Sequence, residues 1–152
     1  MIRRDIFRKP CDVNALATAA LYHDASEILT GDLPTPIKYH NAEIMSAYHA
    51  VEDLAVQKLL GMLPPELRET YAAVLAEDKD GDIYPLVKAA DKLSAYIKCI
   101  EERKAGNNEF LSAEAQTRAA LDASPLPEVQ YFLEHFIPAF ERDLDELGAI
   151  GQ

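Results

Sequence analysis

The spacing of apolar residues most constrains the fold, because in the long segments it follows the period of an α-helix. Between residues 41 and 60, apolar side chains recur at intervals of three and four: Ile44, Tyr48, Val51, Ala55 and Leu59. A second stripe of the same spacing runs between residues 83 and 104: Ile83, Leu86, Ala90, Leu93, Ile97 and Ile100. No segment shows the sustained alternation of a half-buried β-strand. We therefore predict an all-α fold.

Capping and helix-breaking residues divide the chain into about six helices. These are predicted to span residues 13–29, 41–60, 64–76, 83–104, 112–122 and 128–147. Asp12 and Ser112 are candidate N-caps, because their side chains can accept hydrogen bonds from free backbone amides. Gly31 is placed to end the first helix. Pro138 is expected to kink the last one, because proline removes a donor from the helix interior.

The length of 152 residues predicts a single domain over residues 1–152 with one sizeable core. No apolar stretch approaches the roughly 20 residues that a membrane span needs, so no membrane contact is expected. Cys11 and Cys99 are too few for a disulfide framework. We interpret them as reduced thiols of a cytoplasmic protein.

The charge balance bears on possible partners. The formal net charge is −11, and such a surface repels the phosphate backbone of a nucleic acid polymer. A small phosphorylated substrate remains compatible with it if a bound cation reverses the sign locally. The alternative is that the charge serves only solubility.

The sharpest local feature is the pair His23-Asp24, which is followed by Glu27 in an otherwise apolar segment. On a helix, residues three and four apart share a face, so Glu27 could converge with both members of the pair. Imidazole and carboxylate together suit a first-row divalent metal. The alternative is a solvated helix face without function, and the residues alone leave both interpretations open.

A second unusual carboxylate is Asp91, which lies between core-type positions of the predicted helix 83–104. If this side chain faces inward, it needs a cation or a network of hydrogen bonds. The alternative is an exposed carboxylate paired with Lys88 or Lys92. The other histidines show no ligand spacing, and we interpret them as surface or interface residues: His40, His49 and His135.

These motifs resemble the HD superfamily, in which a His-Asp pair is followed at a distance by a further Asp. The similarity is closest to its YfbR-type 5'-deoxynucleotidases. It rests on residues 22–36, which read YHDASEILTGDLPTP, and on residues 90–99, which read ADKLSAYIKC. Residues 106–111 and 131–138 also correspond, so the resemblance covers essentially the whole chain.

The resemblance implies an HD-domain-like helical bundle with a divalent metal such as manganese or cobalt. It implies release of phosphate from deoxyribonucleoside 5'-monophosphates, and a homodimer. The implied metal ligands are His23, Asp24 and Asp91. The implied catalytic carboxylates are Glu27 and Asp24. The wall that contacts the sugar is implied to consist of Asp32, Leu33, Pro34 and Thr35.

One departure from the family lies at the N-terminus. The family has a first metal-binding His and an Arg-Trp pair on upstream helices, whereas here no histidine precedes His23 and the chain has no tryptophan. We therefore expect the N-terminal helices to be missing and at most three of four protein ligands to be present. The alternative to an active enzyme is an impaired HD-like domain that binds a nucleotide or a partner protein. A purely structural oligomerisation module is the third interpretation.

Overall fold

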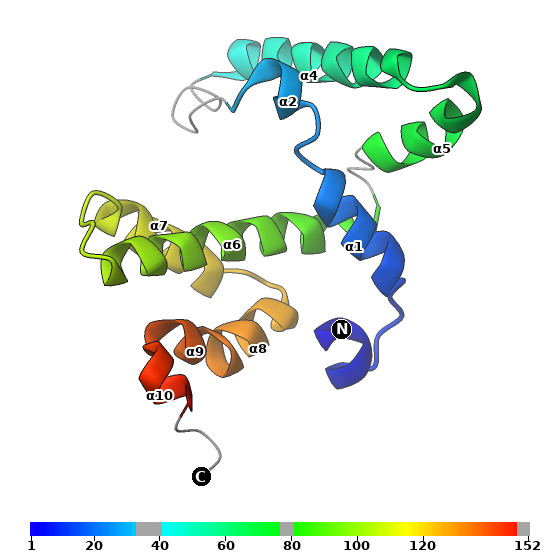
Figure 1. Ribbon diagram of the computed structural model, residues 1–152. Coiled ribbons are helices and arrows are strands. Elements are labelled where there is room, and N and C mark those ends of the chain that lie inside the picture. Colours follow the sequence, from blue (N-terminus) through cyan, green and yellow to red (C-terminus); the bar gives the residue numbers. More distant parts are fainter. Residues whose placement is uncertain (33–40, 77–80, 149–152) are drawn as a thin grey trace. The chain divides into compact units, whose positions relative to one another are not determined.

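The computed structural model describes residues 1–32, 41–76 and 81–148, and this part of the chain is helical without any strand (Figure 1). The all-α prediction is therefore confirmed. The helical elements, in chain order, are η1 (Ile2–Ile6, a π-helix), α1 (Val13–Tyr22), α2 (Glu27–Thr30), α4 (Ala42–Met62), α5 (Pro65–Leu75), α6 (Tyr84–Lys104), α7 (Leu111–Asp122), α8 (Pro127–His135), α9 (Ile137–Glu141) and α10 (Leu144–Gly148).

Several helix ends lie where the sequence predicts them. The side chain of Asn41 accepts a hydrogen bond from the backbone N–H of Ile44 at 2.8 Å and so caps α4. Proline stands in the first turn of both α5 and α6, where no intrahelical donor is lost. Gly106 follows α6 with φ +85°, a conformation that glycine adopts without steric cost.

The first predicted helix, residues 13–29, is wrong as a continuous element. Helix α1 ends at Tyr22, and a turn separates it from α2. In this turn the backbone N–H groups bond three residues back: Ala25 to the carbonyl of Tyr22 at 3.0 Å, and Glu27 to that of Asp24 at 2.9 Å. These bonds are of the tighter 3₁₀ type, which often terminates an α-helix.

The C-terminal prediction also needs correction, because the single kinked helix 128–147 is divided into α8, α9 and α10. The break falls at Phe136, whose φ of −112° departs from helical geometry. Pro138 stands in the first turn of α9. Its ring would clash with the carbonyl four residues earlier in a continuous helix, so the chain interrupts α8 before it.

The N-cap of α7 lies two residues before the predicted one. Phe110 occupies the N-cap position, and no side chain caps the helix there. The hydroxyl of Ser112, predicted to be the cap, instead accepts a hydrogen bond from the side chain of Gln116 at 3.1 Å. Ser112 therefore lies inside the helix.

The chain forms two compact units, which we describe separately. The first, here called the core unit, comprises residues 1–13 and 82–152, and the second, the ligand unit, comprises residues 14–81.

The core unit contains a continuous apolar cluster from α6, α7, α8 and α9: Leu93, Tyr96, Ile100, Leu121, Val129, Leu133 and Ile137. Ile100 is fully buried at 0% exposure. The predicted stripe of α6 is correct in part, since Leu86 is buried but Ala90 is exposed.

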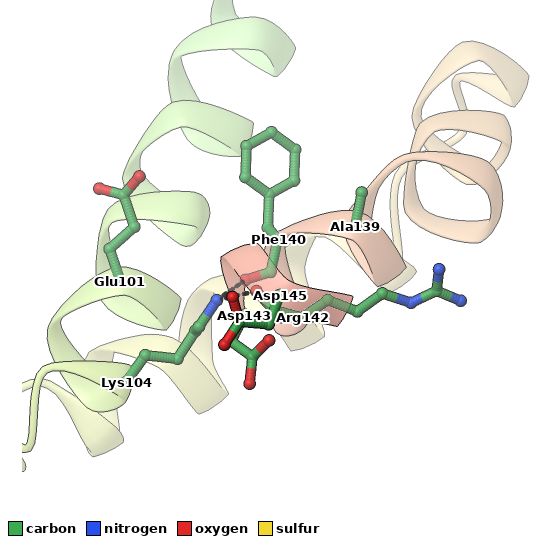
Figure 2. Close-up of a pocket in the computed structure, with 7 residues that line it drawn as sticks. All are labelled: Glu101, Lys104, Ala139, Phe140, Arg142, Asp143 and Asp145. Atoms are coloured by element: carbon green, nitrogen blue, oxygen red, sulfur yellow. Dashed lines mark hydrogen bonds between the residues drawn. The ribbon is translucent and has the colours of Figure 1, made fainter. Parts of the chain in front are cut away.

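Polar contacts reinforce the core unit at one end of α6. Arg103 forms ion pairs with Glu114 of α7 and with Glu141 of α9, at 3.0 and 2.8 Å. Hydrogen bonds from the guanidinium to these carboxylates raise the pKa of Arg103 above its ordinary value. The ammonium of Lys104 donates to the backbone carbonyls of Phe140 and Arg142 (Figure 2). These two basic residues therefore hold α9 against α6.

The ligand unit has few buried residues. Helix α4 contacts α2 and α5, and Ala55 of α4 is buried. In contrast, Leu21 and Leu54 are 81% and 69% exposed, and Val51 of the predicted α4 stripe is exposed as well. Much of the apolar surface here lacks cover from the chain itself. Across the described residues, no helix is both long enough and apolar enough to cross a membrane.

Candidate functional site

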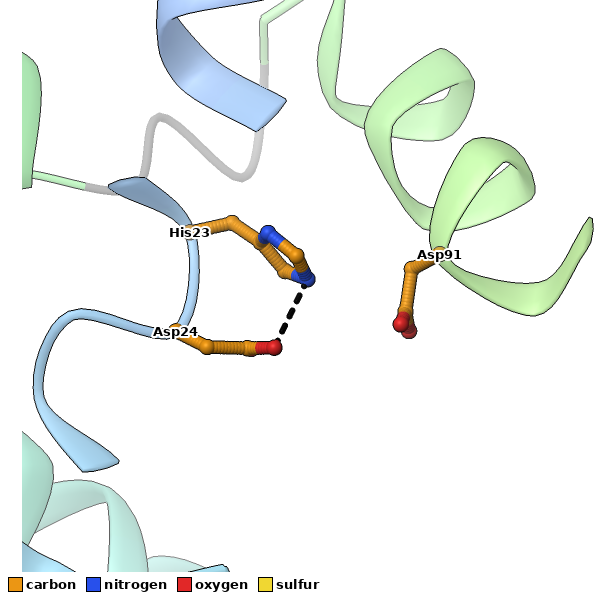
Figure 3. Close-up of side chains that lie close together, drawn as sticks. All are labelled: His23, Asp24 and Asp91. Carbon is orange, nitrogen blue, oxygen red and sulfur yellow. Dashed lines mark ion pairs between the residues drawn. The ribbon is translucent and has the colours of Figure 1, made fainter. Parts of the chain in front are cut away.

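Two of the predicted ligands, His23 and Asp24, lie in the turn after α1. The Nε2 atom of His23 is 3.0 Å from Oδ2 of Asp24 (Figure 3). Two ligand atoms that each bind an ion at about 2.1 Å, at right angles to one another, lie roughly 3.0 Å apart. The separation between the two side chains therefore suits neighbouring positions around one cation.

The orientation of the His23 ring is set by the end of α1. Its Nδ1 atom lies 2.8 Å from the backbone carbonyl of Ala20, in the last turn of the helix. The carbonyls of a last helical turn have no partner within the helix, so this one can accept from the ring. A proton on Nδ1 leaves a lone pair on Nε2, which is the form that binds a metal.

This arrangement fits a cation on chemical grounds. With Nδ1 as the donor, the Nε2 lone pair of His23 faces a carboxylate oxygen of Asp24 at 3.0 Å. Two electron-rich atoms at this distance repel each other unless a proton or a cation is shared between them. The imidazole is half-buried and the Asp24 side chain is 52% exposed, so an ion could reach both.

Glu27, the predicted catalytic carboxylate, is the first residue of α2 and is half-buried. Its backbone N–H donates to the carbonyl of Asp24, so it begins the helix directly after the ligand turn. The regular spacing that the sequence predicts between His23 and Glu27 does not hold, because the turn replaces an α-helical path. Glu27 nevertheless follows the two candidate ligands within one short, hydrogen-bonded segment.

The predicted sugar wall begins just beyond α2. Asp32 is exposed and directly follows Gly31, while Leu33, Pro34 and Thr35 lie outside the described residues. Two hydroxyl groups donate to the carbonyl of Gly31: that of Thr30 at 3.0 Å and that of Tyr48 at 3.1 Å. The sequence assigns Tyr48 to an apolar stripe only; its phenolic hydroxyl, which needs a partner, was the available signal of this contact.

Asp91 belongs to the core unit, on α6. Of the two alternatives that the sequence leaves open, an inward-facing and an exposed carboxylate, the structure shows the exposed one. Leu86, Val87 and Leu93 supply the buried positions of this part of α6. His23, Asp24 and Asp91 each offer one ligand atom of a type that binds divalent ions (Figure 3).

The remaining histidines of the described residues have other contacts. Nδ1 of His49 lies 2.9 Å from a carboxylate oxygen of Glu52, its neighbour on α4. The ring of His135 contacts that of Tyr131, with 4.2 Å between the ring centroids. His40 lies outside the described residues. The interpretation of His49 and His135 as surface or interface residues agrees with these contacts.

Comparison with known proteins decides the family. Residues 1–140 match the YfbR-like family, described as 5'-deoxynucleotidase YfbR-like. The chain belongs to this family. Among YfbR-like relatives, the 5'-deoxynucleotidase YfbR of Shigella flexneri serotype 5b is 52% identical over 140 residues, which cover 90% of this chain and 70% of the relative. The 5'-deoxynucleotidase YfbR of Escherichia coli strain K12 / DH10B is 51% identical over the same shares.

A solved structure agrees with this assignment. The HD-domain phosphohydrolase of Listeria innocua has a TM-score of 0.75 to this chain at 25% sequence identity, over 90% of this chain and 67% of that one. The resemblance and the fold that it implied are therefore confirmed. The HD-domain phosphohydrolase fold also implies a divalent metal, to which the His23–Asp24 pair is chemically suited.

Proposed function

We propose that this YfbR-like chain is a metal-dependent phosphohydrolase that releases phosphate from deoxyribonucleoside 5'-monophosphates. The observation that carries the proposal is the His23–Asp24 pair, with Nε2 and Oδ2 3.0 Å apart and Nδ1 directed to the carbonyl of Ala20. Membership of the family supports the reaction, since relatives at 51–52% identity are named 5'-deoxynucleotidases.

In this proposal His23, Asp24 and Asp91 hold the metal. One imidazole and two carboxylates form a mixed nitrogen and oxygen donor set, which suits manganese or cobalt. When bound, such an ion supplies Lewis-acid charge at the phosphate and lowers the pKa of a coordinated water. It also makes an acidic protein with net charge −11 compatible with an anionic substrate.

Two carboxylates of the chain act on the attacking water and its proton. Glu27 accepts a proton from the attacking water as the water oxygen forms its bond to phosphorus. The bond between phosphorus and the 5'-oxygen then breaks, and the proton held by Glu27 passes to that oxygen. Asp24 has a second role here, because its other oxygen, Oδ1, can accept a hydrogen bond from the water and orient it.

Substrate selection falls to the segment after α2. Asp32 can accept a hydrogen bond from a sugar hydroxyl, and Leu33, Pro34 and Thr35 complete the proposed wall. The prolines restrict the backbone, so that little conformational entropy is lost on binding. The substrate is a mononucleotide and not a nucleic acid polymer, which the acidic surface would repel.

Assembly and compartment are further parts of the proposal. The exposed leucines of the ligand unit, Leu21 and Leu54, offer an apolar surface to a second copy of the chain, which supports a homodimer. Cys11 and Cys99 are both free thiols, which supports a reducing, cytoplasmic environment.

The test is phosphate release from deoxyribonucleoside and ribonucleoside 5'-monophosphates with added manganese or cobalt. We expect release by the wild-type chain, and loss of both release and bound metal in Asp24→Ala. The matched control is Asp53→Ala, which removes an exposed carboxylate from α4 of the same unit and should change neither. A folded wild-type chain that binds nucleotides without releasing phosphate would support the alternative of an impaired binding domain.

A further inference from the structure

The backbone at Gly31 has an uncommon conformation. Its φ of +70° and ψ of 163° fall in a region that is essentially restricted to glycine. A Cβ atom added at this position would meet no atom within 4 Å, so a close neighbour does not explain the glycine. The conformation itself requires glycine, because any residue with a Cβ atom would be strained there.

Two hydrogen bonds converge on the carbonyl of Gly31. The Thr30 hydroxyl donates to it from α2 at 3.0 Å, and the Tyr48 hydroxyl donates to it from α4 at 3.1 Å. A carbonyl oxygen has two lone pairs, so two donors occupy both. The contact from Tyr48 spans 17 positions along the chain, so it is a tertiary restraint on this junction.

The position of this carbonyl determines the orientation of the backbone at Asp32. The carbonyl of Gly31 and the Cα atom of Asp32 belong to one planar peptide unit, so a fixed carbonyl orients the residue that follows. On the other side, the N–H of Gly31 donates to the carbonyl of Glu27 at 2.9 Å. Glu27 and Asp32 are thereby held in one hydrogen-bonded framework, with Tyr48 as its link to α4.

We infer that Tyr48 and Thr30 are positioning residues that orient Asp32 toward the sugar and so hold a fixed wall, into which a ribose with its additional 2'-hydroxyl fits less well than a deoxyribose. This inference rests on the proposed function, in which Asp32 contacts the sugar. Neither hydroxyl needs to touch the substrate, because each acts through the peptide unit between Gly31 and Asp32.

The direct test is Tyr48→Phe, which keeps the ring and removes only the hydroxyl. Loss of one hydrogen bond to the carbonyl should raise KM for deoxyribonucleoside monophosphates about three- to tenfold and leave kcat near wild type. The ratio of kcat/KM for deoxyribose against ribose substrates should fall by a similar factor. Thr30→Val should also raise KM and lower this ratio. Thr30→Ser, which keeps a hydroxyl, should retain the wild-type ratio.

A matched control and a second readout separate positioning from a loss of folding. Tyr131→Phe removes the same hydroxyl from a tyrosine of the core unit and should leave KM and the substrate ratio unchanged. Hydrogen exchange of a peptide that covers Gly31 and Asp32 should become faster in Tyr48→Phe and not in Tyr131→Phe. An unchanged melting temperature in Tyr48→Phe would exclude global unfolding as the cause.

The outcomes distinguish the positioning role of Tyr48 from the proposed function. Wild-type KM, substrate ratio and exchange rate in Tyr48→Phe, with an active wild-type chain, would overturn the positioning role alone. A wild-type chain that neither binds nor hydrolyses a deoxyribonucleoside monophosphate would overturn the proposed function and this inference with it.

Discussion

The two units of the molecule differ in what their buried residues provide. The core unit contains seven residues of a continuous apolar cluster, with Ile100, Leu121 and Val129 at 0–2% exposure. The ligand unit carries His23 and Asp24 in a turn, and its leucines Leu21 and Leu54 are largely exposed. The segment with the candidate chemistry therefore has the smaller core of its own. Segments of that kind belong to the less stable part of a fold.

The largest effect should come from the ligand unit. Glu27→Gln removes the proposed proton acceptor and keeps the side-chain shape, so phosphate release should fall by about two to four orders of magnitude. Bound metal should remain, because Glu27 is not a proposed ligand. Initial rates and metal content measure both expectations, with Glu66→Gln of α5 as the control. Wild-type rates in Glu27→Gln would exclude a catalytic role for Glu27. They would also contradict the assignment of the chemistry to the ligand unit.

Stability, in contrast, should depend on the core unit. Ile100→Ala leaves a cavity among the residues of α6, α7 and α8 and should lower the free energy of unfolding by about 2–5 kcal/mol. Met62→Ala, at a position of the ligand unit that is 64% exposed, should change it by less than about 0.5 kcal/mol. Chemical denaturation of both variants measures the contrast. An equal loss in the two variants would contradict it.

A smaller effect is expected where Arg103 joins three helices of the core unit. Arg103→Gln removes the ion pairs to Glu114 and Glu141, so the melting temperature should fall. Lys98→Gln removes an ion pair to Glu102 within α6 only and should lower it less. If the two variants melt alike, the links from Arg103 to α7 and α9 contribute little.

The smallest effect should appear at acid pH. Hydrogen bonds from Lys98 and Asn107 lower the pKa of Glu102 below its ordinary value near 4.5. The stabilising contribution is therefore present above that value and is lost as the pH falls through the lower pKa of the folded state. Asn107→Ala removes one donor, so acid unfolding should begin at a higher pH than in the wild type. Identical acid transitions would show that this hydrogen bond does not contribute.

Much of the fold could be predicted from local sequence signals. Asn41 and the prolines at residues 65 and 85 mark helix starts by their own chemistry, and Gly106 marks an end by its backbone freedom. The break after Tyr22 was missed, because residues 23–26 contain neither glycine nor proline. Without such a residue the end of the helix has no local sequence signal, and the periodicity of apolar residues does not report it.

The face of α6 illustrates the same limit. Spacing predicts Ala90 in the core, but it is exposed, whereas Tyr96 and Cys99 are buried. The guanidinium of Arg118 from α7 lies 5.9 Å from the centroid of the Tyr96 ring, so α7 packs on this side of the helix. The direction from which a partner helix arrives depends on residues far along the chain, and a single stripe does not contain that information.

The candidate site divides in a similar way. The types and order of His23, Asp24 and Glu27 could be read directly, because their chemistry resides in their side chains. The contribution of Ala20 could not, since it is made by a backbone carbonyl that any residue supplies. The hydrogen bond from the Tyr48 hydroxyl to Gly31 could not be predicted either, because the sequence places Tyr48 in an apolar stripe.

The hydrogen bond from His23 to that carbonyl has a consequence for how the protein can diverge. Every amino acid that replaces Ala20 brings the same oxygen, so no side-chain exchange at residue 20 deletes the acceptor. Side-chain substitutions at residue 20 therefore leave the acceptor of the His23 ring in place. The ring orientation remains sensitive to changes that redirect the main chain, such as an insertion or a deletion between Ala20 and His23.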